Sequence, residues 1–414
     1  MRFDIPGASL KPGAEEKRLD GFDVVVNDYA GHPFQIDLSN ELQSLGHSVT
    51  HLYCNTNVTP RGALQQRPKG PSIRGISTGD RFDKYDVKKR LLAELRYGFG
   101  SVKALLRNRP DVAVSSNVPL VALALITVAC RLLRIRHVLW LQDFQAGLVS
   151  MKLGEDHLVS RGAEAAERWC VRNAAHVVAI SAGFERAVID MGVPSSLVTT
   201  IPNWAPIADM PTVDRCNDWS AGHDLDGRRV FLYSGTLGIK HRPEALVALA
   251  EHLRLVDPDA LVVVVSESIG VEWIEEQRTS ENPLDNLIVL PFQPFDRLPE
   301  VLGSADVLVV LLEEDAGEFS VPSKVLSYLC AGRPVLGLMP GVNAAADLIS
   351  NEAAAGLVAE DIESFLNDGE VLAKDGELRL AMGKRGRTYA EDTFEVAQIA
   401  MRFLEIFDER KMTE

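Results

Sequence analysis

The sequence predicts an α/β protein built from two doubly wound parallel sheets. Short, valine-rich apolar runs alternate with amphipathic segments of helix length, beginning with 22–27, 34–45 and 48–53. Strands separated by helices run parallel and are buried on both faces, so they read as continuous apolar runs. The alternation stops over 205–227, a stretch rich in Pro, Asp and Gly, and then restarts. We therefore expect two Rossmann-like domains that face each other.

The apolar and polar periodicities locate the individual elements. In the first half, strands are predicted at 22–27, 48–53, 111–115, 137–141, 177–180 and 198–201, and helices at 34–45, 88–109, 119–133 and about 160–174. Residues 56–86 are typical of a long surface loop. In the second half, strands are predicted at 229–233, 261–266, 287–290, 306–312 and 334–338, and helices at 243–255, 298–303, 323–331 and 395–407.

The expected domains follow from these elements. They are an N-terminal domain over 22–205, a C-terminal domain over 206–390 and a final helical segment over 391–414. We expect this last segment to pack back toward the N-terminal domain. Capping of the second sheet is the alternative.

Composition and charge exclude several classes of protein. With 46% hydrophobic and 24% charged residues, the 414-residue chain is neither disordered nor fibrous. The net charge of −15 argues against nucleic-acid binding. It is uneven, because residues 1–205 carry 25 Lys/Arg and 20 Asp/Glu (+5), whereas residues 206–414 carry 18 and 38 (−20). The two halves either have different partners or differ only through drift of their surfaces.

Cysteine usage and the apolar segments predict a cytoplasmic protein. The five cysteines are odd in number and widely spaced, without a C-x-x-C motif: Cys54, Cys130, Cys170, Cys216 and Cys330. This pattern predicts neither a disulfide framework nor a zinc site and fits a reducing compartment. Residues 1–20 lack the apolar core of a signal peptide, and 119–133 is shorter than the roughly 20 residues that span a bilayer.

Ligands of such sheets bind beyond the carboxyl ends of the strands, and one loop there suits an anion. The strand at 229–233 is followed by a Gly-x-x-Gly turn and two cations, so the candidate anion-binding residues are Gly235, Thr236, Leu237, Gly238, Lys240 and Arg242. Backbone N–H groups of such a turn can approach a phosphate closely, and the cations add charge. The alternative is a plain turn between strand and helix with solvated basic residues.

A second strand-end segment, 313–325, is rich in carboxylates and leads into a helix. Ser323 is expected to be its N-cap, with Lys324 in the first turn. A lysine there opposes the helix dipole unless an anion is present, which favours a diphosphate nearby.

In the first half, Gln142 and Asp143 end a strand and point toward the cleft between the sheets. Asp143 acts either as a general base or ligand for a sugar hydroxyl, or only as a cap of the next turn. His32 is either a cleft ligand or an ordinary exposed histidine. The Asp-x-Asp segments at 224–226 and 257–259 are interpreted as turns rather than metal sites.

Taken in order, several segments resemble retaining GT-B glycosyltransferases of family 4, especially the bacterial branch that makes colanic acid and other exopolysaccharides. The similarity covers about 22–407. It rests on the loop that starts at Gly31, the segments 140–144, 180–184 and 201–204, the loop over 233–242, and Pro322-Ser323-Lys324 followed by Gly332-Arg333-Pro334.

The resemblance implies transfer of a hexose from a nucleotide-diphosphate sugar, here a UDP- or GDP-sugar, with retention and without a metal or other cofactor. The donor would bind the C-terminal domain through Gly235, Lys240 and Lys324, with Phe292 and Gln293 near the nucleobase. On the acceptor side the resemblance implicates Gly31, His32, Gln35 and Gln142. Asp143, Lys240 and Glu318 are the candidate catalytic residues. Developing charge on the leaving diphosphate would be stabilised electrostatically.

The chain also departs from the family pattern. Many members carry two glutamates separated by seven residues, and alignment on 331–335 puts Ser327 at the second position and Phe319 at the first, with Glu318 adjacent. The identity of the residues that hold the ribose and the donor sugar therefore stays open.

The resemblance implies a saccharide acceptor, which in surface-polysaccharide members is often linked to polyprenyl diphosphate. The basic helix at 88–109 either lies against an anionic inner membrane face or is a solvated surface. Two other functions remain open: a sugar-nucleotide 2-epimerase of related fold, and a non-catalytic protein that binds a nucleotide sugar or a partner transferase.

Overall fold

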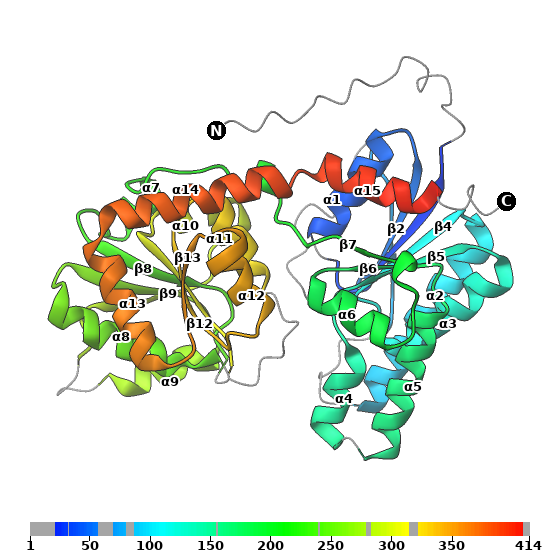
Figure 1. The fold of residues 1–414 in the computed structure, drawn as a ribbon, viewed down its shortest axis with the longest axis horizontal. Coiled ribbons are helices and arrows are strands. Elements are labelled where there is room, and N and C mark those ends of the chain that lie inside the picture. Colours follow the sequence, from blue (N-terminus) through cyan, green and yellow to red (C-terminus); the bar gives the residue numbers. More distant parts are fainter. Residues whose placement is uncertain are drawn as a thin grey trace.

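Two parallel sheets form the framework of the molecule, as the sequence predicts (Figure 1). The computed structural model describes residues 21–31, 33–56, 69–79, 87–154, 156–238, 241–278, 283–313 and 322–408. In this part of the chain one sheet has the order β3-β2-β1-β4-β5-β6-β7 and the other the order β10-β9-β8-β11-β12-β13. Neighbouring strands are parallel in both sheets.

The first half contains the elements from β1 to β7. Its strands are β1 (Asp23–Asp28), β2 (Ser48–Cys54), β3 (Ser72–Ile76), β4 (Val112–Ser116), β5 (Arg136–Leu141), β6 (His176–Ala179) and β7 (Val198–Thr200). Its helices are α1 (Pro33–Ser44), α2 (Val87–Asn108), α3 (Leu120–Leu133), α4 (Gln145–Leu153), α5 (Leu158–Arg172) and α6 (Ala182–Asp190). Gly46, two residues after the end of α1, adopts φ +94°, a backbone conformation that glycine accommodates without a steric cost.

The second half repeats the pattern. Its strands are β8 (Arg229–Ser234), β9 (Ala260–Val265), β10 (Leu287–Leu290), β11 (Val307–Leu311), β12 (Val335–Leu338) and β13 (Gly356–Ala359). The helices are α7 (Asp218–Gly222), α8 (Pro243–Val256), α9 (Ile269–Gln277), α10 (Leu298–Gly303), α11 (Ser323–Ala331), α12 (Ala344–Asp347), α13 (Ile362–Lys374), α14 (Gly376–Thr393) and α15 (Val396–Asp408).

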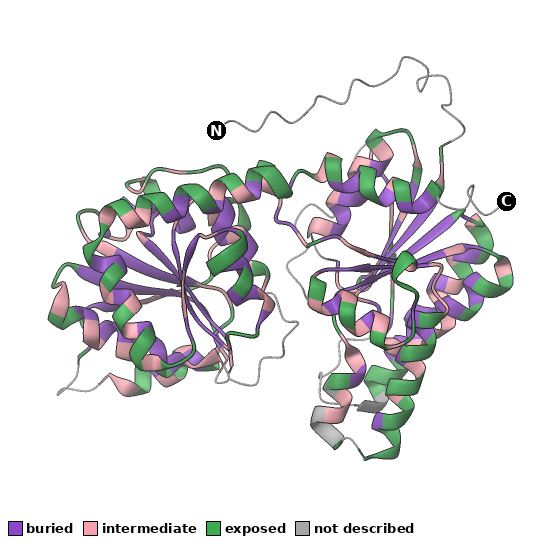
Figure 2. Ribbon diagram, viewed as in Figure 1, coloured by how far each residue is buried: buried purple, intermediate pink, exposed green. Residues whose placement is uncertain are grey.

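The strands are buried because helices cover both faces of each sheet (Figure 2). The six residues of β9, ALVVVV, are all buried, as are the five of β11, VLVVL. Such apolar strands can only be satisfied between two helical layers, and the helices expose their polar faces.

Several elements were not predicted. Strand β3 lies within the expected loop 56–86, where three of its five residues are half-buried, two are exposed, and the segment carries no strong apolar signal. Helices α4, α6, α7, α9, α12, α13 and α14 and strand β13 were also missing from the prediction, since several of them are polar or short. Within the described residues, no helix has both the length and the apolar character of a bilayer-spanning segment.

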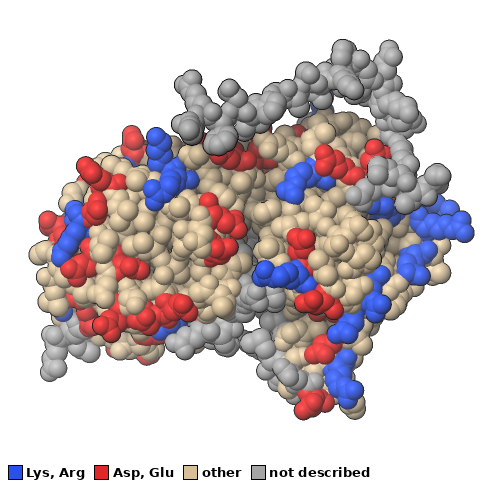
Figure 3. Space-filling model, in the orientation of Figure 1, with Lys and Arg blue, Asp and Glu red and all other residues tan. Residues whose placement is uncertain are grey.

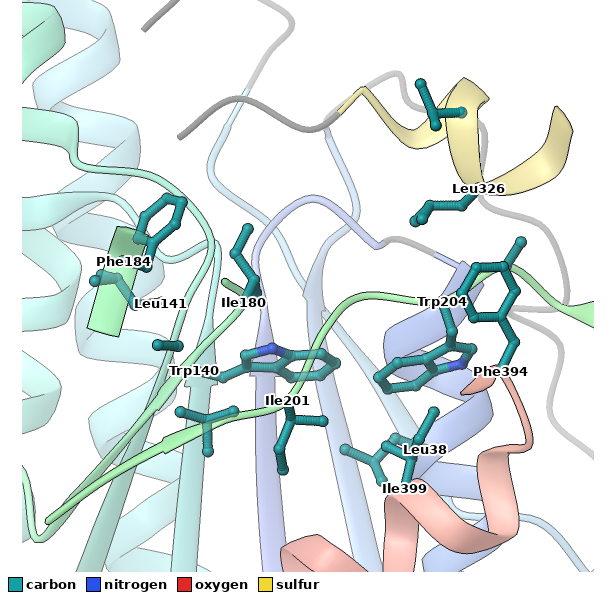
Figure 4. Packing of buried hydrophobic residues seen from close by; sticks show 14 of the residues in the cluster. Leu38, Trp140, Leu141, Ile180, Phe184, Ile201, Trp204, Leu326, Phe394 and Ile399 are labelled. Carbon is teal, nitrogen blue, oxygen red and sulfur yellow. The ribbon is translucent and has the colours of Figure 1, made fainter. Parts of the chain in front are cut away.

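The C-terminal helices connect the two halves. Helices α14 and α15 run along one side of the molecule from the second half to the first (Figure 1). Phe403 of α15 lies 5.2 Å from the ring of Trp140 at the end of β5, and Trp140 stacks on Trp204 at 5.3 Å (Figure 4). Phe407 contacts Phe22 at 5.9 Å. The last helix therefore packs toward the N-terminal sheet, and the alternative of capping the second sheet is wrong for α15.

Candidate functional site

The carboxyl ends of the strands meet at the edge of each sheet, and the candidate donor site lies at this edge of the second sheet. Strand β8, one of the two central strands, ends at Ser234, and its neighbour β9 ends one residue before Ser266. Helix α11 begins near this edge. Its Tyr328 hydroxyl lies 3.0 Å from the Ser234 amide nitrogen, whose N–H it accepts, so α11 is held against the end of β8.

Lys324 of α11 lies directly against the turn that follows β8. Its Nζ donates a hydrogen bond to Tyr233 Oη at 2.7 Å and lies 3.9 Å from the centre of the same ring. A Cβ added at Gly235 would lie 3.2 Å from Nζ of Lys324. Gly235 also has φ +127°, a backbone angle that residues other than glycine rarely adopt. The turn thus needs glycine both for its backbone and for the approach of Lys324.

Burial lowers the pKa of Lys324 to about 7. Tyr233 offers no counter-charge, since burial raises the pKa of its phenol and its hydroxyl donates to Thr236 O at 2.7 Å. The binding of an anion at Gly235 would therefore raise the pKa of Lys324 again. The amine would take up a proton on binding and carry a full positive charge.

The backbone of the Gly-x-x-Gly turn is already engaged. The Gly235 N–H donates to Val265 O, the Leu237 N–H to Ser268 Oγ at 2.9 Å and the Gly238 N–H to His241 Nδ1 at 2.8 Å. These three N–H groups therefore have acceptors within the protein, and the binding of an anion by the turn stays a prediction. The turn is a platform of internal hydrogen bonds, and Lys324 is the cation beside it.

His241 acts as a neutral hydrogen-bond acceptor in this platform. Its Nδ1 must be unprotonated to accept the Gly238 N–H, and burial, followed by the charge of Lys324, lowers its pKa. Ser268 closes the other side, because its hydroxyl also donates to Leu237 O at 2.6 Å.

The start of α11 differs from the prediction. Pro322 is the N-cap and Ser323 is the first helical residue, with its side chain exposed and making no cap hydrogen bond. Proline has no side-chain acceptor, so its side chain does not cap the N–H groups of the first turn. Lys324 does lie in the first turn, as predicted, and Ser327 is half-buried one turn later.

Phe292 and Gln293 follow β10 at the same edge. The Phe292 ring is 45% exposed and available for stacking, while its N–H donates to Glu267 at 3.2 Å. The Gln293 side chain is used internally, accepting from Trp219 Nε1 at 3.1 Å and donating to Pro291 O. Arg242 has φ +54° and its guanidinium lies 3.4 Å from Glu244, so it is paired within α8.

Three predicted residues lie outside the described part of the chain. They are His32, Lys240 and Glu318. Among the described residues, no three His, Cys, Asp or Glu side chains are grouped so that they could hold a metal ion.

On the first half, the predicted acceptor-side residues separate into buried and exposed ones. Gln35 is fully buried and contacts Ser116, and the Gly31 N–H donates to Asp28 at 2.9 Å. Asp143 is exposed at the end of β5. Gln142 forms a reciprocal amide pair with Asn203, at 3.0 and 2.5 Å.

A cavity of about 430 Å³ lies between the two halves, beside this amide pair. It is formed by the segments after β6, β7 and β12 and by the end of α14, including Ser181, Asn203, Val342, Tyr389 and Phe394. Asn203 therefore joins the strand-end residue Gln142 to the cleft. Sequence reasoning missed the structural roles of Asn203, Tyr233, Ser268 and Tyr328, although Ser268, which closely follows a strand, carried a positional signal.

Comparison with known families decides what kind of protein this is. The family description "Glycosyl transferase 4-like domain" matches residues 36–204, and "Glycosyl transferases group 1" matches residues 217–389. The chain belongs to the family-4-type glycosyltransferases.

Two curated relatives of this glycosyltransferase agree over part of its length. WcaI of Escherichia coli K12, provisionally assigned to colanic acid biosynthesis as a glycosyl transferase, is 29% identical over 204 residues, which are 48% of this chain and 49% of WcaI. YtcC of Bacillus subtilis 168, provisionally assigned as a glycosyltransferase, is 24% identical over 45% of this chain and 46% of its own length. The chain thus matches about half the length of these relatives.

Solved structures confirm the GT-B fold over nearly the whole chain. HepE of Anabaena, crystallised with UDP, is 15% identical with a TM-score of 0.70, covering 92% of this chain and 98% of HepE. Sucrose-phosphate synthase of Thermosynechococcus elongatus is 16% identical with a TM-score of 0.71, covering 94% and 99%.

Proposed function

We propose that this glycosyltransferase moves a hexose from a UDP- or GDP-sugar to a saccharide acceptor, with retention, in the synthesis of a cell-surface polysaccharide. Family membership supports the reaction type, and the similarity to WcaI supports the pathway class. HepE has been crystallised with UDP-glucose, which supports a nucleotide sugar as donor.

The observation that carries this proposal is the Lys324 ammonium beside Gly235. It is a partly buried cation at the carboxyl end of β8, where ligands of parallel sheets bind. A donor diphosphate placed there is stabilised most when the leaving group gains charge, so the same cation assists catalysis. Phe292 is proposed to stack on the nucleobase. Lys240 and Glu318 keep the proposed roles of a second phosphate cation and a donor-sugar carboxylate.

Asp143 is the proposed group that contacts the acceptor hydroxyl. It follows β5 on the opposite side of the cleft and is exposed, and an ionised carboxylate at that position can accept the proton of the attacking hydroxyl.

The test is transfer to a saccharide acceptor with each common UDP- and GDP-sugar. We expect release of one nucleoside diphosphate for each sugar transferred to the acceptor. The anomeric configuration of the product, read by proton NMR, should equal that of the donor. Asp143→Asn should reduce kcat at least about 100-fold, while Asp190→Asn, an exposed carboxylate at the end of α6, should leave it unchanged.

The alternatives give different results in the same assay. Isomerisation of the donor without an acceptor would show an epimerase. Binding of UDP or GDP without turnover of any donor would show a non-catalytic protein.

We further propose that the acceptor is lipid-linked and that α2 rests on an anionic membrane. Leu92, Phe99 and Leu106 repeat every seven residues along α2 and are 47%, 61% and 52% exposed. The exposed cations Lys89, Arg96 and Lys103 repeat with the same spacing and form an adjacent row. An apolar row beside a basic row is typical of helices that lie in the interface of anionic membranes.

The surface charge supports this orientation. Lys and Arg side chains gather along the outer edge of the first half, whereas Asp and Glu dominate the second half (Figure 3). An anionic surface would attract the first half and repel the second.

Vesicle sedimentation tests the membrane proposal. We expect the protein to sediment with vesicles that contain anionic lipid at low salt and to be released at high salt. Phe99→Ser with Leu106→Ser should abolish sedimentation, and Met401→Ser, which removes a similarly exposed apolar side chain from α15, should not. Equal sedimentation of both variants would contradict the proposal.

A further inference from the structure

A buried pair of titratable side chains lies at the carboxyl end of β1, outside the donor site. Asp28 is the last residue of β1 and His51 lies on the neighbouring strand β2. Both side chains have 0% exposure, and His51 Nε2 lies 3.6 Å from Asp28 Oδ2. No motif of the sequence pointed to this pair.

The groups around Asp28 are hydrogen-bond donors. The Gly31 N–H donates to Oδ1 at 2.9 Å. The Gln35 amide, oriented so that its oxygen accepts from the Ser116 hydroxyl, donates through its nitrogen to Oδ2 at 2.8 Å. A carboxyl group surrounded by donors is favoured in its ionised form, because a protonated carboxyl would place its own O–H against them.

The neighbours of His51 hold its ring between Ser39 and Asp28. The Ser39 hydroxyl lies 3.2 Å from Gln35 O and 2.8 Å from His51 Nδ1. A proton on His51 Nε2, which both the imidazolium and one neutral tautomer carry, points an N–H at Asp28, and this arrangement is attractive.

The remaining neighbours agree with a negative charge on Asp28. Tyr97 of α2 has its pKa raised by burial and then by the charge of Asp28, and its hydroxyl donates to Leu52 O at 3.3 Å. Cys54 and Tyr29 are the other titratable groups that act on Tyr97 from β2 and the loop after β1.

We propose that Asp28 and His51 are positioning residues: a buried carboxylate–histidine pair that holds the backbone at Gly31 and the start of α1 in the position required by the acceptor. Asp28 accepts from the Gly31 N–H after β1 and from the Gln35 amide in the first turn of α1. This inference rests on the proposed function, since the loop matches the acceptor side of the family.

The energetics support a role in positioning. A buried carboxylate loses its hydration, so it needs the hydrogen bonds and the histidine that surround it. Removal of one of these partners leaves a buried polar group unsatisfied and forces the surrounding backbone to rearrange.

The experiment compares His51→Gln and Asp28→Asn with His176→Gln. His176 is a suitable control, because it is also buried and pairs with a hydroxyl, that of Thr199 at 2.9 Å, but lies at the amino end of β6. We expect both loop variants to raise the KM for acceptor at least tenfold. Dissociation constants for UDP or GDP should change less than twofold. The control should resemble the intact protein.

Two structural readouts separate this inference from the proposed function. Hydrogen exchange at the Gly31 amide should accelerate at least tenfold in Asp28→Asn and not in His176→Gln. Nitrogen-15 spectra of the intact protein should show that His51 Nε2, the ring nitrogen that faces Asp28, carries a proton. These results are expected even if no transfer reaction is found.

Unchanged Gly31 exchange, or a His51 Nε2 without a proton, would overturn the inference even if transfer is observed. An acceptor KM that changes as much in His176→Gln as in His51→Gln would also overturn it, because any buried histidine would then have the same effect.

Discussion

The strands β1 and β8 occupy equivalent central positions in the two sheets, yet each ends beside a buried charge of opposite sign. At β8 the group is the Lys324 ammonium, which lies against Gly235 with tyrosine hydroxyl and ring as neighbours. At β1 it is the Asp28 carboxylate, which is surrounded by donors. The same topology thus serves two purposes.

The difference between the two ends lies in whether the charge is already compensated. Asp28 has His51 and two hydrogen-bond donors, so it stabilises a fixed loop. Lys324 has only neutral partners among its described contacts, and burial lowers its pKa. A charge without a partner at a strand end is expected of a ligand site, and a compensated one of a structural device.

The largest effect is expected from Lys324→Met. Removal of the ammonium should weaken UDP or GDP binding about 30- to 100-fold, because a charge-assisted hydrogen bond contributes about 2–3 kcal/mol. The measurement is isothermal titration calorimetry. His51→Gln, at the other strand end, should leave the same affinity unchanged, and equal losses in both variants would remove the distinction between the ends.

Gly235→Ala should reduce nucleotide affinity about tenfold and destabilise the fold by about 1–3 kcal/mol. The left-handed backbone and the approach of Lys324 both exclude a side chain there. Gly147→Ala, in α4, where nothing lies within 4 Å of an added Cβ, is the control and should be neutral. Urea denaturation and calorimetry give the two quantities. A neutral Gly235→Ala variant would mean that the turn does not need this geometry.

The affinity for UDP or GDP should fall with rising pH above 7, by up to tenfold per pH unit. The free protein loses the Lys324 proton as pH rises through about 7, whereas the diphosphate-bound form retains it. The slope should vanish in Lys324→Met. Titrations between pH 7 and 9 test this, and a slope that survives in Lys324→Met would assign it to another group.

Stability should follow the same group with the opposite sign. Because the pKa of Lys324 is lowered by folding, the unfolded chain binds more protons between pH 7 and 10.5, and the unfolding free energy should rise over this window. In Lys324→Met the part of this rise that is due to Lys324 should be absent. Thermal melts at several pH values measure it.

The smallest effect is expected from Phe292→Ala. Loss of a stacked nucleobase should cost about 1–2 kcal/mol of binding, roughly five- to thirtyfold, and change stability by less than about 0.5 kcal/mol, since the ring is exposed. Phe295→Ala removes a ring of similar exposure three residues later and should not affect affinity. Equal effects would place the nucleobase elsewhere.

Much of the fold could be predicted from periodicity. The elements Leu287–Leu290, Leu298–Gly303 and Ser323–Ala331 begin and end at the predicted residues, because apolar period and Gly or Pro boundaries coincide there. Strand β3 and the polar helices α13 and α14 were missed, since their positions depend on packing rather than on an apolar run. At the site, the sequence predicted the turn after β8 and the position of Lys324. It did not predict that amides of the turn donate to acceptors within the protein.

The sequence alone determined the alternation of strands and helices, the glycine at the turn after β8 and the lysine in the first turn of α11, because these depend on local period and backbone conformation. Only the tertiary structure decided that Lys324 reaches Gly235 and that His51 faces Asp28. Their partners are separated by 89 and 23 residues along the chain, and no local rule encodes which side chains two sheets and their helices bring together.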